Sequence, residues 1–144
     1  MGTLIDRARP DDAPAVLRLL ERNGLPREGL TDWMATTLVA REDGQIIGSA
    51  ALEIYPDGAL LRSVAVAPEA QRQGVGRELT AAAIHLADTL NAPALYLLTT
   101  TAERFFPKFG FERIARADVP ATVQASIEFT SACPSTATVM RKTL

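Results

Sequence analysis

A glycine-spaced, cationic segment most constrains the fold, because it separates an apolar, strand-like run at 60–66 from a helix-like run at 78–90. The segment reads Gln71-Arg72-Gln73-Gly74-Val75-Gly76-Arg77. The first N–H groups of a helix have no partner within the helix, and the helix dipole adds about half a positive charge there. Two glycines keep the backbone accessible, and two arginines add cationic donors. The pattern therefore predicts a site for a phosphate or pyrophosphate group at a helix N-terminus.

Two common phosphate-binding motifs do not fit this segment. No Gly-Lys-Ser/Thr follows the glycines, as a P-loop would require, and the spacing is not the G-x-G-x-x-G of dinucleotide-binding folds. Nucleoside triphosphate and NAD are therefore disfavoured as ligands.

The residues around the glycines resemble a known family. The run Leu61-Arg62-Ser63-Val64-Ala65-Val66-Ala67-Pro68-Glu69, followed by Gln71-x-x-Gly74-x-Gly76, is similar to the acetyl-coenzyme A signature Q/R-x-x-G-x-G/A of the GNAT N-acetyltransferases. Downstream, Ala102 and Phe105-Phe106-Pro107-Lys108-Phe109-Gly110-Phe111 resemble the "A…FY-x-K-x-GF" segment of that superfamily. The resemblance implies an α/β GNAT fold, with a mixed, mostly antiparallel sheet of about seven strands and helices on both faces. It also implies transfer of an acetyl group from acetyl-coenzyme A (acetyl-CoA) to the primary amine of a small molecule.

The same resemblance implies where acetyl-CoA would bind. In this superfamily the strand that corresponds to 61–66 ends in a bulge and separates from the strand that corresponds to 94–98. The pantetheine lies in the gap between them, and the glycine turn holds the pyrophosphate. The implied cofactor-binding residues are Val64, Ala65, Val66, Gln71, Arg72, Gln73, Gly74, Val75, Gly76, Arg77, Thr99 and Phe106.

Length and composition agree with one enzyme domain spanning residues 1–144. A formal net charge of −2 gives no general attraction to nucleic acid or to an anionic membrane. Cys133 is the only cysteine, and no apolar run is long enough for a membrane span. We therefore expect a cytoplasmic protein without metal, nucleic-acid or membrane partners, either a monomer or a homodimer.

The order of hydrophobic runs and turns predicts the elements of the sheet. We expect strands at 4–9, 38–41, 45–55, 59–66, 94–98, 111–116 and 136–142, with hairpins at Asp43-Gly44 and Asp57-Gly58. Helices are expected after Asp11 or Asp12, near 30–35, from about 75 to 90, and briefly after Asp118. The only histidine, His85, falls opposite the apolar stripe of the long helix and is expected in solvent. Thr100-x-x-Glu103 predicts a capping box for one more short helix.

Glu53 is the candidate general base for removing a proton from the amine. It lies near the end of a mainly apolar strand, where partial burial would raise its pKa toward a useful range. A solvated carboxylate before the Pro56-Asp57-Gly58 turn is an equally good interpretation.

The chain departs from the superfamily where a general acid is often found. Phe106 occupies the usual tyrosine position and cannot donate a proton, and Thr99 replaces a frequent asparagine. Solvent can protonate the departing thiolate instead. Thr99, Thr100 and Thr101 either hydrogen-bond the thioester region or only end a strand and cap a helix.

Arg62 and Tyr55 are the candidate acceptor-binding residues. Arg62 interrupts the apolar face of its strand, so a buried guanidinium there needs a partner. That partner is either a carboxylate of the protein, Glu53 or Glu128, or an anionic group of the substrate. Tyr55, like Trp33 and Phe129, either lines an acceptor pocket or packs in the core.

A narrower resemblance concerns the acceptor. The runs at 60–64, 96–103 and 127–134 look like a subgroup of acetyltransferases encoded with arsenic-resistance genes. This resemblance suggests an amino-acid-like or arsenic-containing toxic amine, and Cys133 is then structural or incidental. Two alternatives stay open, namely a noncatalytic acyl-CoA sensor and an acetyltransferase acting on a protein or peptide.

Overall fold

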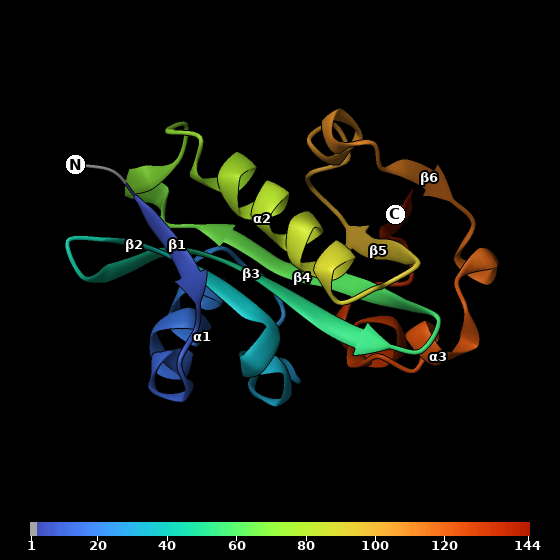
Figure 1. Ribbon diagram of the computed structural model, residues 1–144. Coiled ribbons are helices and arrows are strands. Elements are labelled where there is room, and N and C mark those ends of the chain that lie inside the picture. The colour runs from blue at the N-terminus through green and yellow to red at the C-terminus, as the bar shows by residue number, and fades with distance from the viewer. Residues whose placement is uncertain (1–2) are drawn as a thin grey trace.

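One seven-stranded sheet in the order β1-β2-β3-β4-β5-β7-β6 forms the centre of the computed structural model, which describes residues 3–144 (Figure 1). Every neighbouring pair of strands is antiparallel except β4 and β5, which are parallel. The strands are β1 (Leu4–Arg7), β2 (Thr37–Glu42), β3 (Gln45–Tyr55), β4 (Gly58–Val66), β5 (Ala94–Thr99), β6 (Glu112–Ile114) and β7 (Thr138–Thr143). The expected mixed, mostly antiparallel α/β sheet is confirmed.

Helices cover both faces of this sheet, and Figure 1 shows α1 and α2 on opposite sides of it. The α-helices are α1 (Ala13–Arg22), α2 (Val75–Thr89) and α3 (Ala121–Gln124). Short 3-10 turns occupy Pro10–Asp12, Leu30–Thr36, Pro68–Ala70, Phe106–Phe109 and Arg116–Asp118, and a π-helical turn occupies Glu128–Ala132. Within residues 3–144, no helix combines the length and apolar character needed to cross a membrane.

Local sequence explains the two hairpins that build the first half of the sheet. Asp43 and Gly44 both have positive φ, 52° and 77°, as a tight two-residue hairpin between β2 and β3 requires. Gly58 begins β4 after the second turn, and an added Cβ there would lie 2.8 Å from the Tyr96 ring. Both hairpins therefore agree with the sequence-based expectation.

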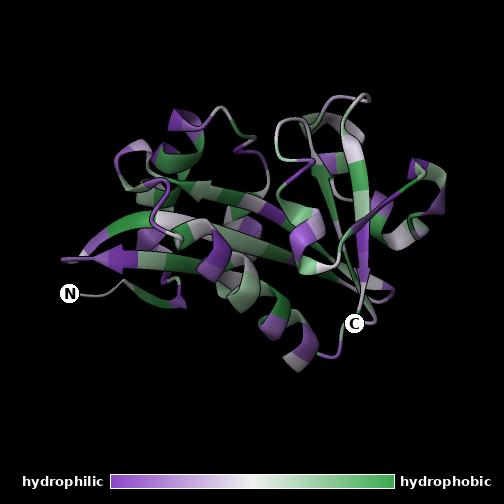
Figure 2. Ribbon diagram, turned by 90° about the horizontal axis from the view of Figure 1, so that it is seen from above, coloured by the Kyte–Doolittle hydropathy of each residue, from purple (hydrophilic) through white to green (hydrophobic). Residues whose placement is uncertain are grey.

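The long helix α2 packs one apolar stripe on the sheet. Val75, Leu79 and Ala83 are buried against it, while His85 is exposed on the outer face as expected. Figure 2 shows this alternation of apolar and polar residues around the helices. Leu90 does not continue the stripe, because α2 ends at Thr89 and Leu90 is 38% exposed.

A bulge and a divergence open the sheet at its middle. Ser63 and Val64 together oppose Ala50, because Arg62 pairs with Ala51 and Ala65 pairs with Ser49. Ser63 has φ 59°, which is uncommon for a residue with a side chain. Beyond two paired positions, Ala59 with Leu95 and Leu60 with Tyr96, β4 and β5 have no ladder pairs. The two strands therefore separate toward their C-terminal ends.

Two expectations for the second half of the chain are wrong. Thr100-x-x-Glu103 does not begin a helix, because Ala102 N–H donates to Thr99 Oγ1 (2.9 Å) and the 3-10 turn begins only at Phe106. The strand expected at 111–116 is shorter, because only Glu112–Ile114 pairs with β7 and Arg116 begins a 3-10 turn.

Candidate active site

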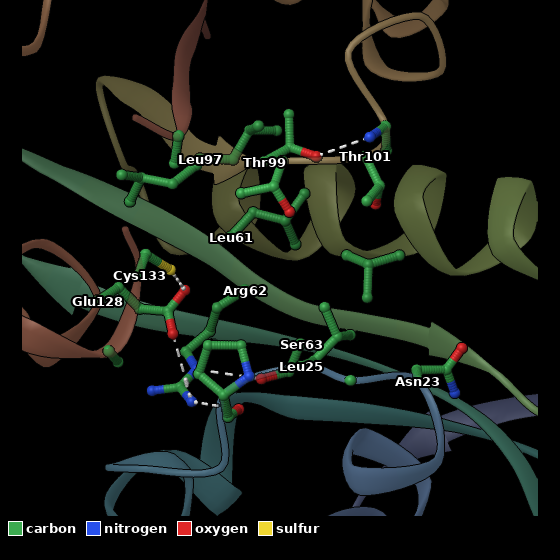
Figure 3. A pocket seen from close by; sticks show the side chains of 18 of the residues that line it. Asn23, Leu25, Leu61, Arg62, Ser63, Leu97, Thr99, Thr101, Glu128 and Cys133 are labelled. Atoms are coloured by element: carbon green, nitrogen blue, oxygen red, sulfur yellow. Dashed lines mark hydrogen bonds and ion pairs between the residues drawn. The ribbon is translucent and has the colours of Figure 1, made fainter. Parts of the chain in front are cut away.

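A cavity of about 850 Å³ fills the gap between β4 and β5. Its walls come from four parts of the chain: the loop after α1, the second half of β4 with the start of α2, the end of β5 with the following loop, and the segment before β7. Figure 3 shows side chains from these parts facing one another across the opening. Because the strands diverge there, both present backbone groups that the sheet itself does not pair.

Six of the residues predicted to bind the cofactor line this cavity. They are Val64, Val66, Gln71, Gly76, Thr99 and Phe106. Ala65 and Val75 are buried in the core beside them, and the remaining four, Arg72, Gln73, Gly74 and Arg77, are exposed. The structure thus brings the bulge and the glycine turn together around one opening.

The glycine turn is shaped to leave room at the N-terminus of α2. Gly74 is the N-cap residue of this 15-residue helix, with φ 82° and no side-chain cap. An added Cβ at Gly74 would meet nothing within 4 Å, and one at Gly76 would lie 3.5 Å from Val66 Cγ2. Gln71 steadies the turn by donating from Nε2 to the Val66 carbonyl (3.1 Å). Free amides at an open helix end suit a pyrophosphate group.

The bulge in β4 is held from the core side. Buried Ser49 donates from Oγ to the Ser63 carbonyl (2.7 Å), which fixes the left-handed residue in place. Ser63 and Val64 both line the cavity. Backbone groups freed by a bulge are suitable partners for the amides of an extended ligand.

Arg62 is the centre of a buried ion-pair cluster at one end of the cavity. Its Nη1 lies 2.9 Å from Glu53 Oε2, its Nη2 lies 3.6 Å from Glu128 Oε2, and its side chain has no exposed area. It also donates to Ser63 Oγ (3.0 Å) and to the Pro26 carbonyl (3.3 Å). Both carboxylates anticipated from the sequence are therefore its partners. These contacts favour a structural ion pair over a clamp for a substrate anion.

Glu53 is more enclosed than a strand-end carboxylate would be. It is 1% exposed, does not line the cavity, and binds Arg62 through one oxygen and the Tyr55 hydroxyl through the other. Burial, followed by that hydrogen bond, raises the pKa of Tyr55 well above its usual value. Tyr55 packs edge-on against Trp33 at 5.6 Å and is likewise outside the cavity wall. The solvated interpretation of Glu53 is wrong, and its role as the base stays a prediction.

Glu128 and Cys133 reach the cavity from the C-terminal segment. Cys133 Sγ donates to Glu128 Oε1 (3.4 Å), as Figure 3 shows beside Arg62. Burial raises the pKa of Cys133 to about 12, so this side chain is a thiol rather than a thiolate near neutral pH. Burial also raises the pKa of Glu128, although Arg62 acts in the opposite direction.

The end of β5 closes the opposite side of the cavity without a tyrosine. Phe106 occupies the position discussed above and packs edge-on against Phe105 and Phe111 at 5.1 and 5.8 Å. The Thr99 hydroxyl accepts a hydrogen bond from the Ala102 amide, while Thr100 and Thr101 are exposed at the rim. Thr99 is thus the last residue of β5 and lines the cavity, and its contact with the thioester region stays a prediction.

Sequence reasoning missed the loop after α1 as a cavity wall. Asn23, Leu25, Pro26 and Glu28 all line the cavity, but their sequence has no motif that indicates it. The only local signal is Gly29, whose φ is 80° and whose added Cβ would lie 2.8 Å from Ile127 Cγ2. This glycine permits the loop to lie directly against the segment that carries Glu128.

The parallel pair that separates beside a bulge and an open helix N-terminus is the arrangement that the resemblance to the GNAT superfamily implies for acetyl-CoA binding. In agreement, the chain belongs to the GNAT acetyltransferase family, because the model of the acetyltransferase (GNAT) domain matches residues 34–113. Across residues 3–144, no group of three or more His, Cys, Asp or Glu is placed to hold a metal ion.

One curated protein and two solved structures illustrate the similarity of this chain to known proteins. The chain is 30% identical over 127 residues to an amino-acid acetyltransferase of Neisseria meningitidis, with 82% of this chain and 29% of that protein covered. It is similar to N-acetylglutamate synthase from Neisseria gonorrhoeae, solved with coenzyme A and N-acetyl-glutamate (TM-score 0.85, 24% identity, 100% of this chain and 35% of that one). Rv2747 from Mycobacterium tuberculosis, solved in complex with CoA, gives a TM-score of 0.82 at 24% identity, with 98% and 99% covered. The chain thus spans less than a third of the curated relatives that it matches.

Proposed function

We propose that this chain is an N-acetyltransferase domain that moves the acetyl group of acetyl-CoA to the primary amine of a small, amino-acid-like molecule. The observation that carries the proposal is a cavity of about 850 Å³ that runs from the glycine turn to the buried cluster around Arg62. A donor held at one end and an amine held at the other would meet inside it.

The residues present fit acetyl-CoA as the donor. Free amides of the Gly74 turn and the exposed Arg72 and Arg77 suit the pyrophosphate, and the bulge at Ser63 and Val64 suits the pantetheine amides. Acetyl-CoA itself supplies an activated acyl carbon on a thiol leaving group. The protein would supply position, exclusion of water, and a group that removes a proton from the amine.

Amino acids are the acceptor class that the relatives support, since the curated ones are amino-acid acetyltransferases. The sequence resemblance to arsenic-resistance acetyltransferases adds arsenic-containing amino acids to that class. Arg62 is not available to hold an acceptor anion while it binds Glu53 and Glu128. The proposal therefore gives Arg62 no role in binding an acceptor anion.

The test is release of coenzyme A by the purified protein with a panel of acceptors. The panel contains the standard amino acids, an arsenic-containing amino acid, simple uncharged-chain amines, and peptides with a free N-terminus. Turnover confined to small amines would support the proposal, and turnover only with peptides would replace it with the protein-directed alternative.

The absence of a tyrosine at Phe106 is the observation that favours the second candidate, a noncatalytic acyl-CoA sensor. Calorimetry that detects tight binding of acetyl-CoA, together with no acceptor-dependent release of coenzyme A across the whole panel, would establish the sensor. It would also exclude the transferase.

A further inference from the structure

Glu128 differs from every other carboxylate near the cavity in being both buried and part of its wall. Its side chain is 7% exposed, and it lines the cavity with Cys133, which follows it on the same turn of chain. Glu53 is equally buried but lies behind Arg62 and outside the wall. Glu28 lines the wall but is exposed to solvent.

Charge is not balanced within this cluster. One guanidinium, that of Arg62, faces two carboxylates, and it is closer to Glu53 (2.9 Å) than to Glu128 (3.6 Å). Glu53 receives a second donor from Tyr55, whereas the second donor to Glu128 is the weak thiol of Cys133. Glu128 is therefore the carboxylate whose negative charge is least compensated, and it is the one that a ligand in the cavity can reach.

We infer that Glu128 binds the ammonium group of the acceptor and takes its proton, which makes this side chain the general base and the determinant of selectivity for cationic primary amines. The inference rests on the transferase function proposed above. An arriving ammonium supplies the positive charge that the cluster lacks, and it does so at the wall of the same cavity that leads to the donor site.

The proposed step balances in atoms and charge. One N–H proton of the ammonium passes to a Glu128 oxygen, which leaves a neutral amine with a free electron pair. This nitrogen attacks the acetyl carbonyl carbon, so that a C–N bond forms and the C–S bond breaks. The sulfur leaves with the bonding electrons and takes the second proton that the nitrogen loses, while Glu128 returns its proton to solvent. The products are the N-acetylated amine, coenzyme A thiol and one proton.

The environment of Glu128 makes its carboxylate a stronger base than that of an ordinary glutamate. Burial raises its pKa, the negative charges of Glu53 and Glu28 act in the same direction, and Arg62 and the Cys133 thiol act against them. A carboxyl group with a raised pKa is a stronger base than an ordinary one when it is ionised.

The first experiment replaces the Glu128 carboxylate with an amide of the same size and shape. Glu128→Gln is expected to lower kcat/KM for a cationic amine by about a hundredfold or more at neutral pH, with unchanged affinity for acetyl-CoA. Activity should recover as the pH rises, because hydroxide then removes the proton in solution. Glu112→Gln, which removes an exposed carboxylate of β6, is the matched control and should behave as the wild type.

The second experiment changes the pKa of Glu128 by replacing its neighbours while Glu128 itself is kept. Cys133→Ala removes a donor to the carboxylate and should shift the acidic limb of kcat/KM to higher pH. Glu28→Gln removes a nearby negative charge and should shift the same limb to lower pH. These opposite shifts would identify Glu128 as the titrating group, since both neighbours act on it.

The outcomes separate this inference from the transferase function. If the wild type acetylates amines but Glu128→Gln keeps full activity and its acidic limb, Glu128 is not the base and the transferase assignment stands. If Glu53→Gln loses the limb and Glu128→Gln keeps it, the base is Glu53 and the inference is overturned. If the wild type transfers no acetyl group to any amine, both fail together.

Discussion

Arg62 ties three parts of the chain together through a single side chain. It contacts Glu53 on β3, the Pro26 carbonyl in the loop after α1, and Glu128 in the C-terminal segment. Its guanidinium has the several fixed donors that such a junction requires, which a lysine would not supply. Removing one member of a buried charge cluster leaves the others without compensation, so the cost is larger than the value of any single contact.

Replacing Arg62 with methionine should therefore lower the free energy of unfolding by about 3–5 kcal/mol at neutral pH. The loss should shrink in acid, because burial raises the pKa of Glu128 and a protonated Glu128 needs no cationic partner. Urea denaturation at pH 7 and pH 4.5 measures both values. The double variant Arg62→Met/Glu53→Gln should lose less than the sum of the single variants, and strict additivity would contradict a coupled cluster.

Asp12 and Arg41 form a second ion pair, which joins the start of α1 to β2. The Arg41 hydrogen bond holds the pKa of Asp12 below its usual value. A carboxyl group with a lowered folded-state pKa stabilises the fold above its unfolded-state pKa, and this contribution is lost as the pH falls through the folded-state value.

Asp12→Asn should accordingly destabilise the protein at pH 7, by about 1–2 kcal/mol for a mostly buried charge-assisted pair. The difference from the wild type should begin to fall near pH 4, about the pKa of an unfolded aspartate, and should vanish in stronger acid. Thermal melts between pH 2.5 and 7 measure it. A difference that is constant over this range would show that the charge of Asp12 contributes nothing.

At the scale of elements, the N-terminus of α2 is open because Gly74 and Gly76 have no side chains. A side chain at Gly76 would have room in the fold, since its Cβ would make only ordinary contact with Val66 and Phe105. The space that it would enter belongs to the cavity. Gly74 differs, because its φ of 82° strains any other residue whatever the space around it.

Gly76→Val should therefore separate binding from folding. We expect the melting temperature of the free protein to change little, while the rise in melting temperature caused by acetyl-CoA is largely lost. Gly74→Val should lower both. Thermal shift with increasing acetyl-CoA measures the effect, and an unchanged ligand-induced shift in both variants would remove the pyrophosphate site from this turn.

Across the whole molecule, the buried apolar residues form two clusters. The larger packs α1 and α2 against the first strands and continues to Leu95, Leu97 and Met140 in β5 and β7. The smaller joins Leu60 and Tyr96 to Val119, Val123 and Val139. The smaller cluster anchors the C-terminal segment on the sheet. It therefore sets the position of Glu128 and Cys133 at the cavity wall.

Loosening the smaller cluster should affect acceptor use more than donor use. Val123→Ala should cost about 1–3 kcal/mol of stability through the cavity it leaves, and it should raise the KM for the amine more than the KM for acetyl-CoA. Val39→Ala, at an equally buried position in β2, is the control for stability alone. Equal effects of the two variants on both KM values would contradict a positioning role for the segment.

How far the sequence predicts this structure depends on how far apart along the chain the contacting residues lie. Turns such as Asp43-Gly44 and the stripe of α2 are local patterns, so these parts agree with expectation. The glycine turn lies at the start of α2 as expected, and its binding of a pyrophosphate stays a prediction. The left-handed Ser63 has no residue signature, because serine is not the usual choice there. Glu128 lies on a short π-helical turn far along the chain from Arg62, and only the folded sheet brings the two together.

The separation of β4 from β5 also divides the sheet into two half-sheets. The seam between them, along β4 and β5, has only two paired positions. Amide protons along this seam should exchange with solvent quickly when the cavity holds water, and slowly when a ligand with amide groups fills it. Protection measured by hydrogen–deuterium exchange at Ser63 to Val66 should then rise with the concentration of acetyl-CoA and follow its binding curve. Exchange at the open edge of β4 would in this way report how much of the protein holds acetyl-CoA. Unpaired strand edges, which on other proteins can pair with unwanted partners, would here pair with the ligand.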